Sequence, residues 1–122
     1  MTKASAACVL IVTMLLARAA PAAEKSFELA IRDNAVPSSA RVLRVQKNDR
    51  VVLRLTSDAQ GELHLHGYRL AEKLVPGTAR ELVFDAYATG RYRLEWHPAT
   101  GQASDTRGHH GPPLATLEVR PQ

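Results

Sequence analysis

The chain has 122 residues, and its 16 lysine and arginine residues exceed its 12 acidic residues, which gives a formal net charge of +4. Aromatic residues make up only 5% of the chain. This low share, together with the export that the N-terminus indicates, argues against nucleic-acid binding.

Residues 1–23 have the pattern of a secretory signal peptide. Lys3 supplies a positive charge, an apolar run follows, and Ala20-x-Ala22 fits the small-x-small rule for cleavage. The apolar run is shorter than the ~20 residues of a membrane-spanning helix. We therefore expect one mature domain over residues 24–122, which is periplasmic or secreted and does not contact the membrane after cleavage. An uncleaved N-terminal anchor is the alternative.

Loss of the signal peptide changes the chemistry that the mature chain can carry. Lys3 and Arg18 leave with it, so the net charge falls from +4 to +2. Cys8, the single cysteine, leaves as well, so the mature chain has no disulfide bond, thiolate ligand or cysteine nucleophile. The domain must be held together by its hydrophobic core, and ~100 residues are enough for one.

Alternating apolar and polar residues, the pattern of half-buried β-strands, recur along the mature chain, and no helical period is present. Pro76-Gly77 suits a type II turn, and a long loop rich in glycine and polar residues is expected over 97–113. Tyr92, at a strand start, resembles the tyrosine corner of Greek-key sandwiches. The expected strands are 26–32, 41–46, 51–56, one that carries His64 and His66, 79–84, 91–96 and 114–120, and residues 68–75 are expected to form an extended segment or a short strand. Seven or eight short strands predict an all-β sandwich or barrel.

The order of several short motifs resembles that of the cupredoxin-like family. Each motif is common by itself, and only their order and spacing carry the resemblance. They are the turn over residues 45–51, in which Asn48 stands where the family usually has glycine, the histidine-bearing strand, Pro76-Gly77, Phe84, Gly90-x-Tyr92, a loop with histidine and glycine, and Leu117-x-Val119. The resemblance covers most of the mature chain, is closest to an exported subgroup, and implies a cupredoxin-like Greek-key β-sandwich of two sheets.

Blue-copper members of this family hold copper with two histidines, one cysteine and usually a methionine. The resemblance places the first histidine at His64 or His66 and the second at His109 or His110. The cysteine position falls on Trp96, and the methionine position carries no methionine. A blue-copper thiolate site is therefore excluded in the mature chain, which argues against electron transfer and leaves a histidine-only site.

The five histidines are the candidate metal ligands. His64 and His66 lie two residues apart on one strand, so their side chains point to the same face, ~6.5 Å apart along the backbone. Glu62 and Glu95 are expected to orient an imidazole. Imidazole nitrogen suits Cu(II), Zn(II) and Ni(II), and we expect copper as the cofactor, with zinc or no metal as alternatives. The predicted ligands are His64, His66, His97, His109 and His110.

An alternative reading of the histidine strand stays open. If Leu63 and Leu65 face the core, His64 and His66 face outward and are surface residues of an exposed sheet. They then form a metal site only if further histidines lie over the same face.

We do not expect an enzyme, because the chain has no Gly-x-Ser-x-Gly elbow or other nucleophile motif. The sequence predicts an exported cupredoxin-like module that binds a metal ion, copper before zinc, through a histidine-only site and serves in metal handling. The alternative function is a metal-free structural or protein-interaction β-sandwich. The expected partners are the metal ion and a periplasmic protein.

Overall fold

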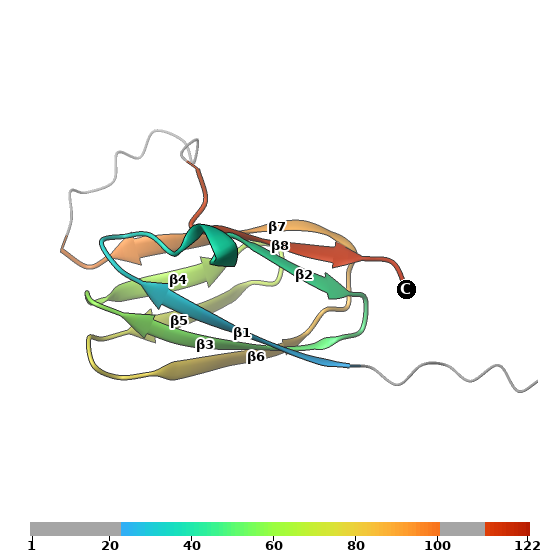
Figure 1. Ribbon diagram of the computed structural model, residues 1–122, viewed down its shortest axis with the longest axis horizontal. Coiled ribbons are helices and arrows are strands. Elements are labelled where there is room, and N and C mark those ends of the chain that lie inside the picture. Colours follow the sequence, from blue (N-terminus) through green and yellow to red (C-terminus); the bar gives the residue numbers. More distant parts are fainter. Residues whose placement is uncertain (1–22, 101–111) are drawn as a thin grey trace, which may run out of the picture.

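The structure is a computed structural model that describes residues 23–100 and 112–122. Eight β-strands and one 3-10 turn form the described part of the chain (Figure 1). They are β1 (Glu24–Ile31), η1 (Ser38–Ala40), β2 (Val42–Gln46), β3 (Arg50–Ser57), β4 (Gly61–Leu65), β5 (Leu70–Leu74), β6 (Arg80–Asp85), β7 (Gly90–Pro98) and β8 (Ala115–Arg120). The expected signal peptide lies outside the described residues except for Ala23. Within 23–100 and 112–122, no helix is long and apolar enough to cross a membrane.

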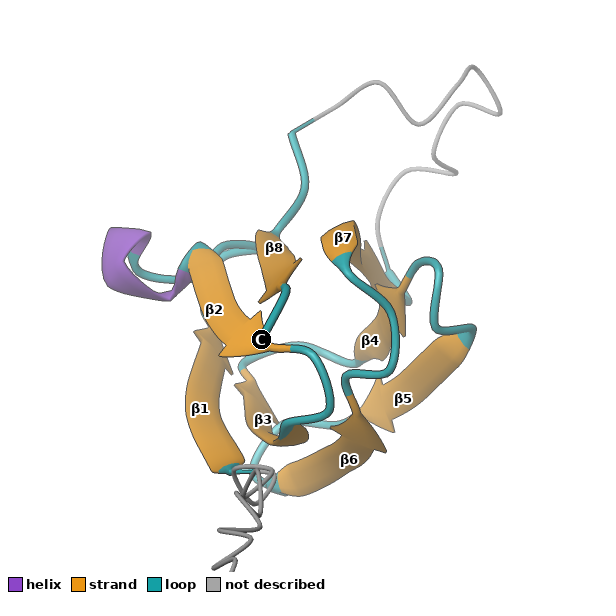
Figure 2. Cartoon of the chain, turned by 90° about the vertical axis from the view of Figure 1, so that its right-hand side faces the viewer, coloured by secondary structure: helices purple, strands orange, loops and turns teal. Residues whose placement is uncertain are grey.

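The strands form two sheets that face each other (Figures 1 and 2). One sheet has the order β1-β3-β6 and the other the order β2-β8-β7-β4-β5. The pairs β1–β3 and β2–β8 are parallel, and the remaining pairs are antiparallel. The prediction of an all-β sandwich with seven or eight strands is confirmed.

The hydrophobic core lies between the two sheets and follows from the alternation in each strand. In β4, Leu63 and Leu65 are 0% and 1% exposed, while Glu62 and His64, which alternate with them, are only half-buried. Leu117 on β8 is fully buried in the same core. Full burial of one such leucine contributes ~1.5–3 kcal/mol. Because the leucines of β4 face inward, His64 on this strand faces outward, and His66, just after the strand, is exposed.

Two turns have the backbone that their residues favour, and the one at Pro76-Gly77 was predicted. Asp33 and Asn34 both have positive φ, 49° and 59°, and close a tight turn between β1 and the segment that follows. Gly77 has a φ of 78°, and the amide of Thr78 donates to the carbonyl of Val75 at 3.3 Å, as a type II turn requires.

The predicted tyrosine corner is also present at the start of β7. The Tyr92 hydroxyl lies 3.0 Å from the carbonyl oxygen of Ala88 and 2.9 Å from that of Thr89. The ring of Tyr68 packs edge-on against Tyr92, with 4.8 Å between the ring centroids. Tyr68 is 8% exposed, and burial raises the pKa of its phenol.

One expected boundary was wrong. The loop predicted to begin at residue 97 begins later, because Pro98 still pairs with Gly61 on β4 and the next amide, of Ala99, donates to Gln60. Backbone pairing across the sheet, which composition does not reveal, sets this boundary. The extended segment or short strand expected over 68–75 contains β5, which begins at Leu70 because Gly67 and Arg69 adopt positive φ and turn the chain before it.

Candidate metal site

Strands β4 and β7 place a group of ionisable side chains on the outer face of the five-stranded sheet. In the antiparallel register, His64 lies opposite Glu95 and Glu62 lies opposite His97. Residues directly opposite each other share a face, and so do residues two apart on a strand. The backbone amide of His66, just past β4, donates to Arg93 at 3.0 Å, which continues this register.

Three of the five predicted ligands meet here. The ring centroids of His64 and His97 are 4.7 Å apart, and those of His64 and His66 are 6.3 Å apart. The prediction that His64 and His66 share a face is thus confirmed, and His97 joins them from a strand and not from a loop. His109 and His110 lie outside the described residues.

The carboxylates of Glu62 and Glu95 contact these three imidazoles. Glu62 Oε1 lies 2.5 Å from His64 Nε2, and Glu95 Oε2 lies 3.0 Å from His66 Nε2 and 3.8 Å from His97 Nε2. The contacts expected of Glu62 and Glu95 with the histidines are therefore present. We call His64, His66, His97, Glu62 and Glu95 the histidine cluster.

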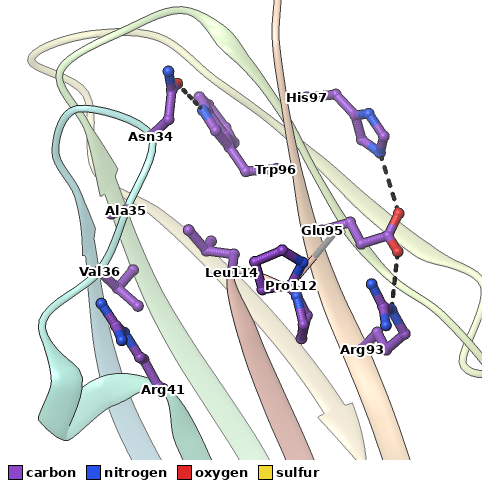
Figure 3. A pocket seen from close by; sticks show the side chains of 11 residues that line it. Asn34, Ala35, Val36, Arg41, Arg93, Glu95, Trp96, His97, Pro112 and Leu114 are labelled. Atoms are coloured by element: carbon purple, nitrogen blue, oxygen red, sulfur yellow. Dashed lines mark hydrogen bonds and ion pairs between the residues drawn. The ribbon is translucent and has the colours of Figure 1, made fainter. Parts of the chain in front are cut away.

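Arg93 binds the other oxygen of Glu95, with 3.1 Å between Nε and Oε1 (Figure 3). The Glu95 side chain is only 12% exposed although it lies on an outer sheet face, because its neighbours cover it. The sequence reasoning missed Arg93. Its position two residues before Glu95 on an alternating strand was the signal that it shares this face.

The spacing of the imidazoles suits a shared ion. A metal–nitrogen bond of ~2.0–2.1 Å places the ion ~3.2 Å from an imidazole centroid, so two ligating rings have centroids ~5 Å apart at a tetrahedral angle and ~6.4 Å apart when opposite. The two measured separations, 4.7 and 6.3 Å, lie close to this range. Imidazole and carboxylate donors also suit Cu(II) and Zn(II).

The orientation of the same side chains does not yet suit an ion. Among the residues that the structure describes, no group of three or more His, Asp, Glu or Cys is placed to hold a metal. The physical reason is that the Nε2 atoms of His64 and His66 point to carboxylates. The cluster can bind a metal only if these imidazoles turn away from Glu62 and Glu95, or present their other nitrogen.

A pocket of about 500 Å³ adjoins the histidine cluster at the end of β7 (Figure 3). Alternation along β7 gives it two kinds of wall, since His97 and Glu95 point to one side of the strand and Trp96 to the other. The indole of Trp96 donates to Asn34 Oδ1 at 3.0 Å. The lining residues are Asn34, Ala35, Val36, Arg41, Arg93, Glu95, Trp96, His97, Pro112, Pro113 and Leu114. Trp96, at the position that the resemblance gave to cysteine, thus contributes an aromatic wall and no thiolate.

Comparison with known proteins gives structural matches only. No protein-family profile and no curated protein matches the chain. Among solved structures, a heme-copper terminal oxidase dimer matches with a TM-score of 0.58 and 22% identity over 93% of this chain and 78% of that chain. A multicopper oxidase matches with a TM-score of 0.58 and 17% identity over 80% of this chain and 42% of that chain.

The periplasmic domain of subunit II of cytochrome oxidase (CoxB) from Bradyrhizobium japonicum matches with a TM-score of 0.55 and 14% identity. This match covers 84% of this chain and 86% of that chain. The chain therefore spans most of this domain and less than half of the multicopper oxidase. At these identities the likeness shows the fold and not the activity. The chain therefore has a cupredoxin-like β-sandwich fold, as the order of its sequence motifs predicted.

Proposed function

We propose that this domain is an exported module that binds a transition-metal ion, copper first, and serves in metal handling without being an enzyme. The observation that carries the proposal is the gathering of His64, His66 and His97 on one exposed sheet face, at spacings that one ion can bridge. His109 and His110, outside the described residues, are further proposed ligands. The periplasm is the proposed location, and a periplasmic protein is the proposed second partner.

Two considerations support copper over other metals. The names of the structural neighbours include a heme-copper oxidase, multicopper oxidases and a copper nitrite reductase. Independently, Cu(II) binds a given set of nitrogen and oxygen donors more tightly than other divalent first-row metals, including Zn(II). A copper site is therefore the expected outcome when both ions are offered at equal concentration.

The chemistry of the cluster favours holding an ion over passing electrons through it. The proposed mature chain, residues 24–122, has no cysteine and no methionine, because Cys8, Met1 and Met14 all precede residue 24. Without a thiolate and a thioether, the site lacks the soft ligands that tune a blue-copper potential. The bound ion would offer Lewis acidity and positive charge. The protein's own part is to supply neutral imidazole nitrogens and to accept hydrogen bonds at Glu62 and Glu95.

One observation favours the metal-free alternative, a structural or protein-interaction sandwich. The Nε2 atoms of His64 and His66 already contact carboxylates, so the cluster is satisfied without an ion. Contacts of this kind at an exposed face stabilise a fold by little, typically ~0–1 kcal/mol. They present a low barrier to an ion that binds the imidazoles more strongly.

The deciding experiment is a calorimetric titration of the exported protein with Cu(II) and with Zn(II) at pH 7.5. We expect sub-micromolar Cu(II) binding, weaker Zn(II) binding, and a loss of about tenfold or more in Cu(II) affinity in the His64→Ala/His66→Ala variant. Below pH ~6.5 binding should weaken, because the metal ligand is the neutral imidazole.

Arg54→Gln serves as the control, because Arg54 lies exposed on the outer face of the other sheet. This variant should bind copper as the natural protein does. The pair His109→Ala/His110→Ala then shows whether the loop histidines belong to the site. Absence of copper binding, or equal binding by the His64→Ala/His66→Ala variant, would leave the metal-free sandwich as the better account.

A further inference from the structure

A second charged group occupies the opposite part of the same sheet face. Arg44 on β2 and Arg91 on β7 lie on either side of Glu118 on β8, directly opposite it in the register of the three strands. These strands lie next to one another around the C-terminus (Figure 2). Arg44 Nε is 3.2 Å from Glu118 Oε2, and Arg91 Nη2 is 3.5 Å from Glu118 Oε1. Arg120 Nη2 is 3.5 Å from Glu118 Oε2.

We call Arg44, Arg91, Arg120 and Glu118 the arginine cluster, and its charges do not balance. Three guanidinium groups contact one carboxylate, which leaves a formal excess of two positive charges. The arginine side chains are 59%, 73% and 63% exposed, whereas the Glu118 side chain is 15% exposed. The carboxylate is thus covered, and the surface that meets solvent is cationic.

A shallow hollow extends this cationic surface around the sheet edge. It has a volume of about 250 Å³, and its lining includes Lys25 beside Arg44 and Arg120. Each guanidinium has five N–H donors in a planar fork. The contacts with Glu118 use a small part of them, so most donors of the cluster are available to water or to another acceptor.

Stability gives little reason for this surplus of arginines. The outer face of the other sheet has no such surplus, because Arg50 contacts Glu24 at 3.9 Å and Arg54 contacts Glu81 at 3.3 Å, and two further acids lie opposite the same arginines, Asp85 and Glu28. Exposed ion pairs contribute little to folding, and a second or third cation at one carboxylate also repels the first. The surplus therefore points to an acceptor outside the chain.

We propose that the arginine cluster docks a partner protein through a carboxylate-rich surface of that partner. Guanidinium forks match carboxylates in bidentate geometry, and arginine is enriched at protein interfaces from which lysine is depleted. Glu118 at the centre disfavours a dense polyphosphate or an anionic lipid surface, whose charges would face it directly. Separate carboxylates of a partner protein can instead bind between the guanidinium groups.

This docking surface borders the histidine cluster. Arg93, the contact of Glu95, follows Arg91 by two residues on the same face of β7. A protein seated on the arginine cluster therefore lies beside the proposed metal ligands. The docking inference does not depend on metal binding, and each can fail without the other.

The test uses the exported protein labelled with ¹⁵N and an octaglutamate peptide as the probe, at low salt. We expect saturable amide shift changes centred on β2, β8 and β7, and affinity that falls as salt is added. Arg44→Gln/Arg91→Gln should weaken binding about tenfold or more. Arg50→Gln/Arg54→Gln also removes two positive charges, but from the other sheet, and should leave the affinity for octaglutamate within about twofold.

Three results would overturn the inference. The first is that no peptide binds at low salt. The second is an equal loss of peptide affinity in the two double variants, which would make net charge the cause. The third is tighter binding to vesicles that contain phosphatidylglycerol than to the peptide; if Arg44→Gln/Arg91→Gln abolished that vesicle binding, the surface would be assigned to a membrane. Inorganic phosphate at the same charge concentration should not compete with the peptide.

Discussion

The histidine cluster and the arginine cluster occupy one face of one sheet, yet they carry opposite charge. With neutral imidazoles, Glu62, Glu95 and Arg93 give the first region a formal charge of −1, whereas the arginine cluster has a charge of +2. The first region suits a bound cation and the second a bound anion. The same pleated scaffold, with the same rule of alternation, thus presents two surfaces that differ only in their outward residues.

The core residues beneath the two clusters should respond alike to truncation. These substitutions have the largest expected effect on the free energy of unfolding. Leu63 lies under the histidine cluster and Leu117 under the arginine cluster, and both are 0% exposed. Leu63→Ala and Leu117→Ala should each lower the free energy of unfolding by ~2–5 kcal/mol, because each leaves a cavity in one shared core. Urea denaturation measures both. A loss below ~1 kcal/mol at either position would mean that the core is not continuous beneath the two clusters.

A glycine at the edge of the histidine region gives the next largest effect. Gly67 has a φ of 86°, and a Cβ there would lie 2.5 Å from the Tyr92 ring, so Gly67→Ala adds overlap to backbone strain. We expect a loss of ~2–3 kcal/mol. Gly77→Ala is the matched control, because Gly77 has a φ of 78° but open space around it, and it should lose ~1 kcal/mol. Equal losses would show that contact with Tyr92 does not constrain the turn after His66.

Replacing one carboxylate in each cluster sharpens the comparison of charge. Glu95→Gln should lower Cu(II) affinity by about tenfold, because it removes the negative charge and replaces one of the two carboxylate oxygens that contact Arg93 and the imidazoles with an amide donor. Glu118→Gln should leave Cu(II) affinity unchanged and raise octaglutamate affinity, because it removes the one negative charge of the arginine cluster. Calorimetry with each ligand measures the four values. If Glu118→Gln changed copper binding as much as Glu95→Gln, the two regions would not be separate sites.

The smallest expected effect concerns Tyr68, away from both clusters. Burial raises the pKa of Tyr68 above its ordinary value of 10.0, so the folded chain keeps this proton at pH values where the unfolded chain loses it. The resulting stability is complete below pH 10 and declines as pH rises through the folded pKa. Tyr68→Phe should therefore show a smaller fall in the urea midpoint between pH 9 and 11. An identical fall in both proteins would mean that other groups cause the alkaline loss.

The sequence predicted the strands well because alternation is a local signal. The alternation is clearest in β4, where Leu63 and Leu65 are apolar and Glu62 and His64 are polar. The same signal placed His64 and His66 on one face. It could not show that His97 lies on a strand, because its pairing with Glu62 joins segments far apart in the chain. The place of His109 and His110 remains a prediction from sequence.

The arginine cluster escaped sequence reasoning for the same physical reason. Arg44, Arg91 and Arg120 are widely separated in the chain, and only the pairing of β2, β8 and β7 brings them to Glu118. Each arginine, taken alone, is typical of a solvated surface charge. The excess appears only when the register of three strands is known.

The central claim is that copper binds the imidazoles of the histidine cluster, and electron paramagnetic resonance tests it most directly. With one equivalent of Cu(II) at pH 7.5, the protein without residues 1–23 should give a tetragonal copper spectrum with splitting from two or more nitrogen ligands. The His64→Ala/His66→Ala variant should lose that splitting. A spectrum that is the same in the two proteins would contradict the account, because copper would then be bound elsewhere.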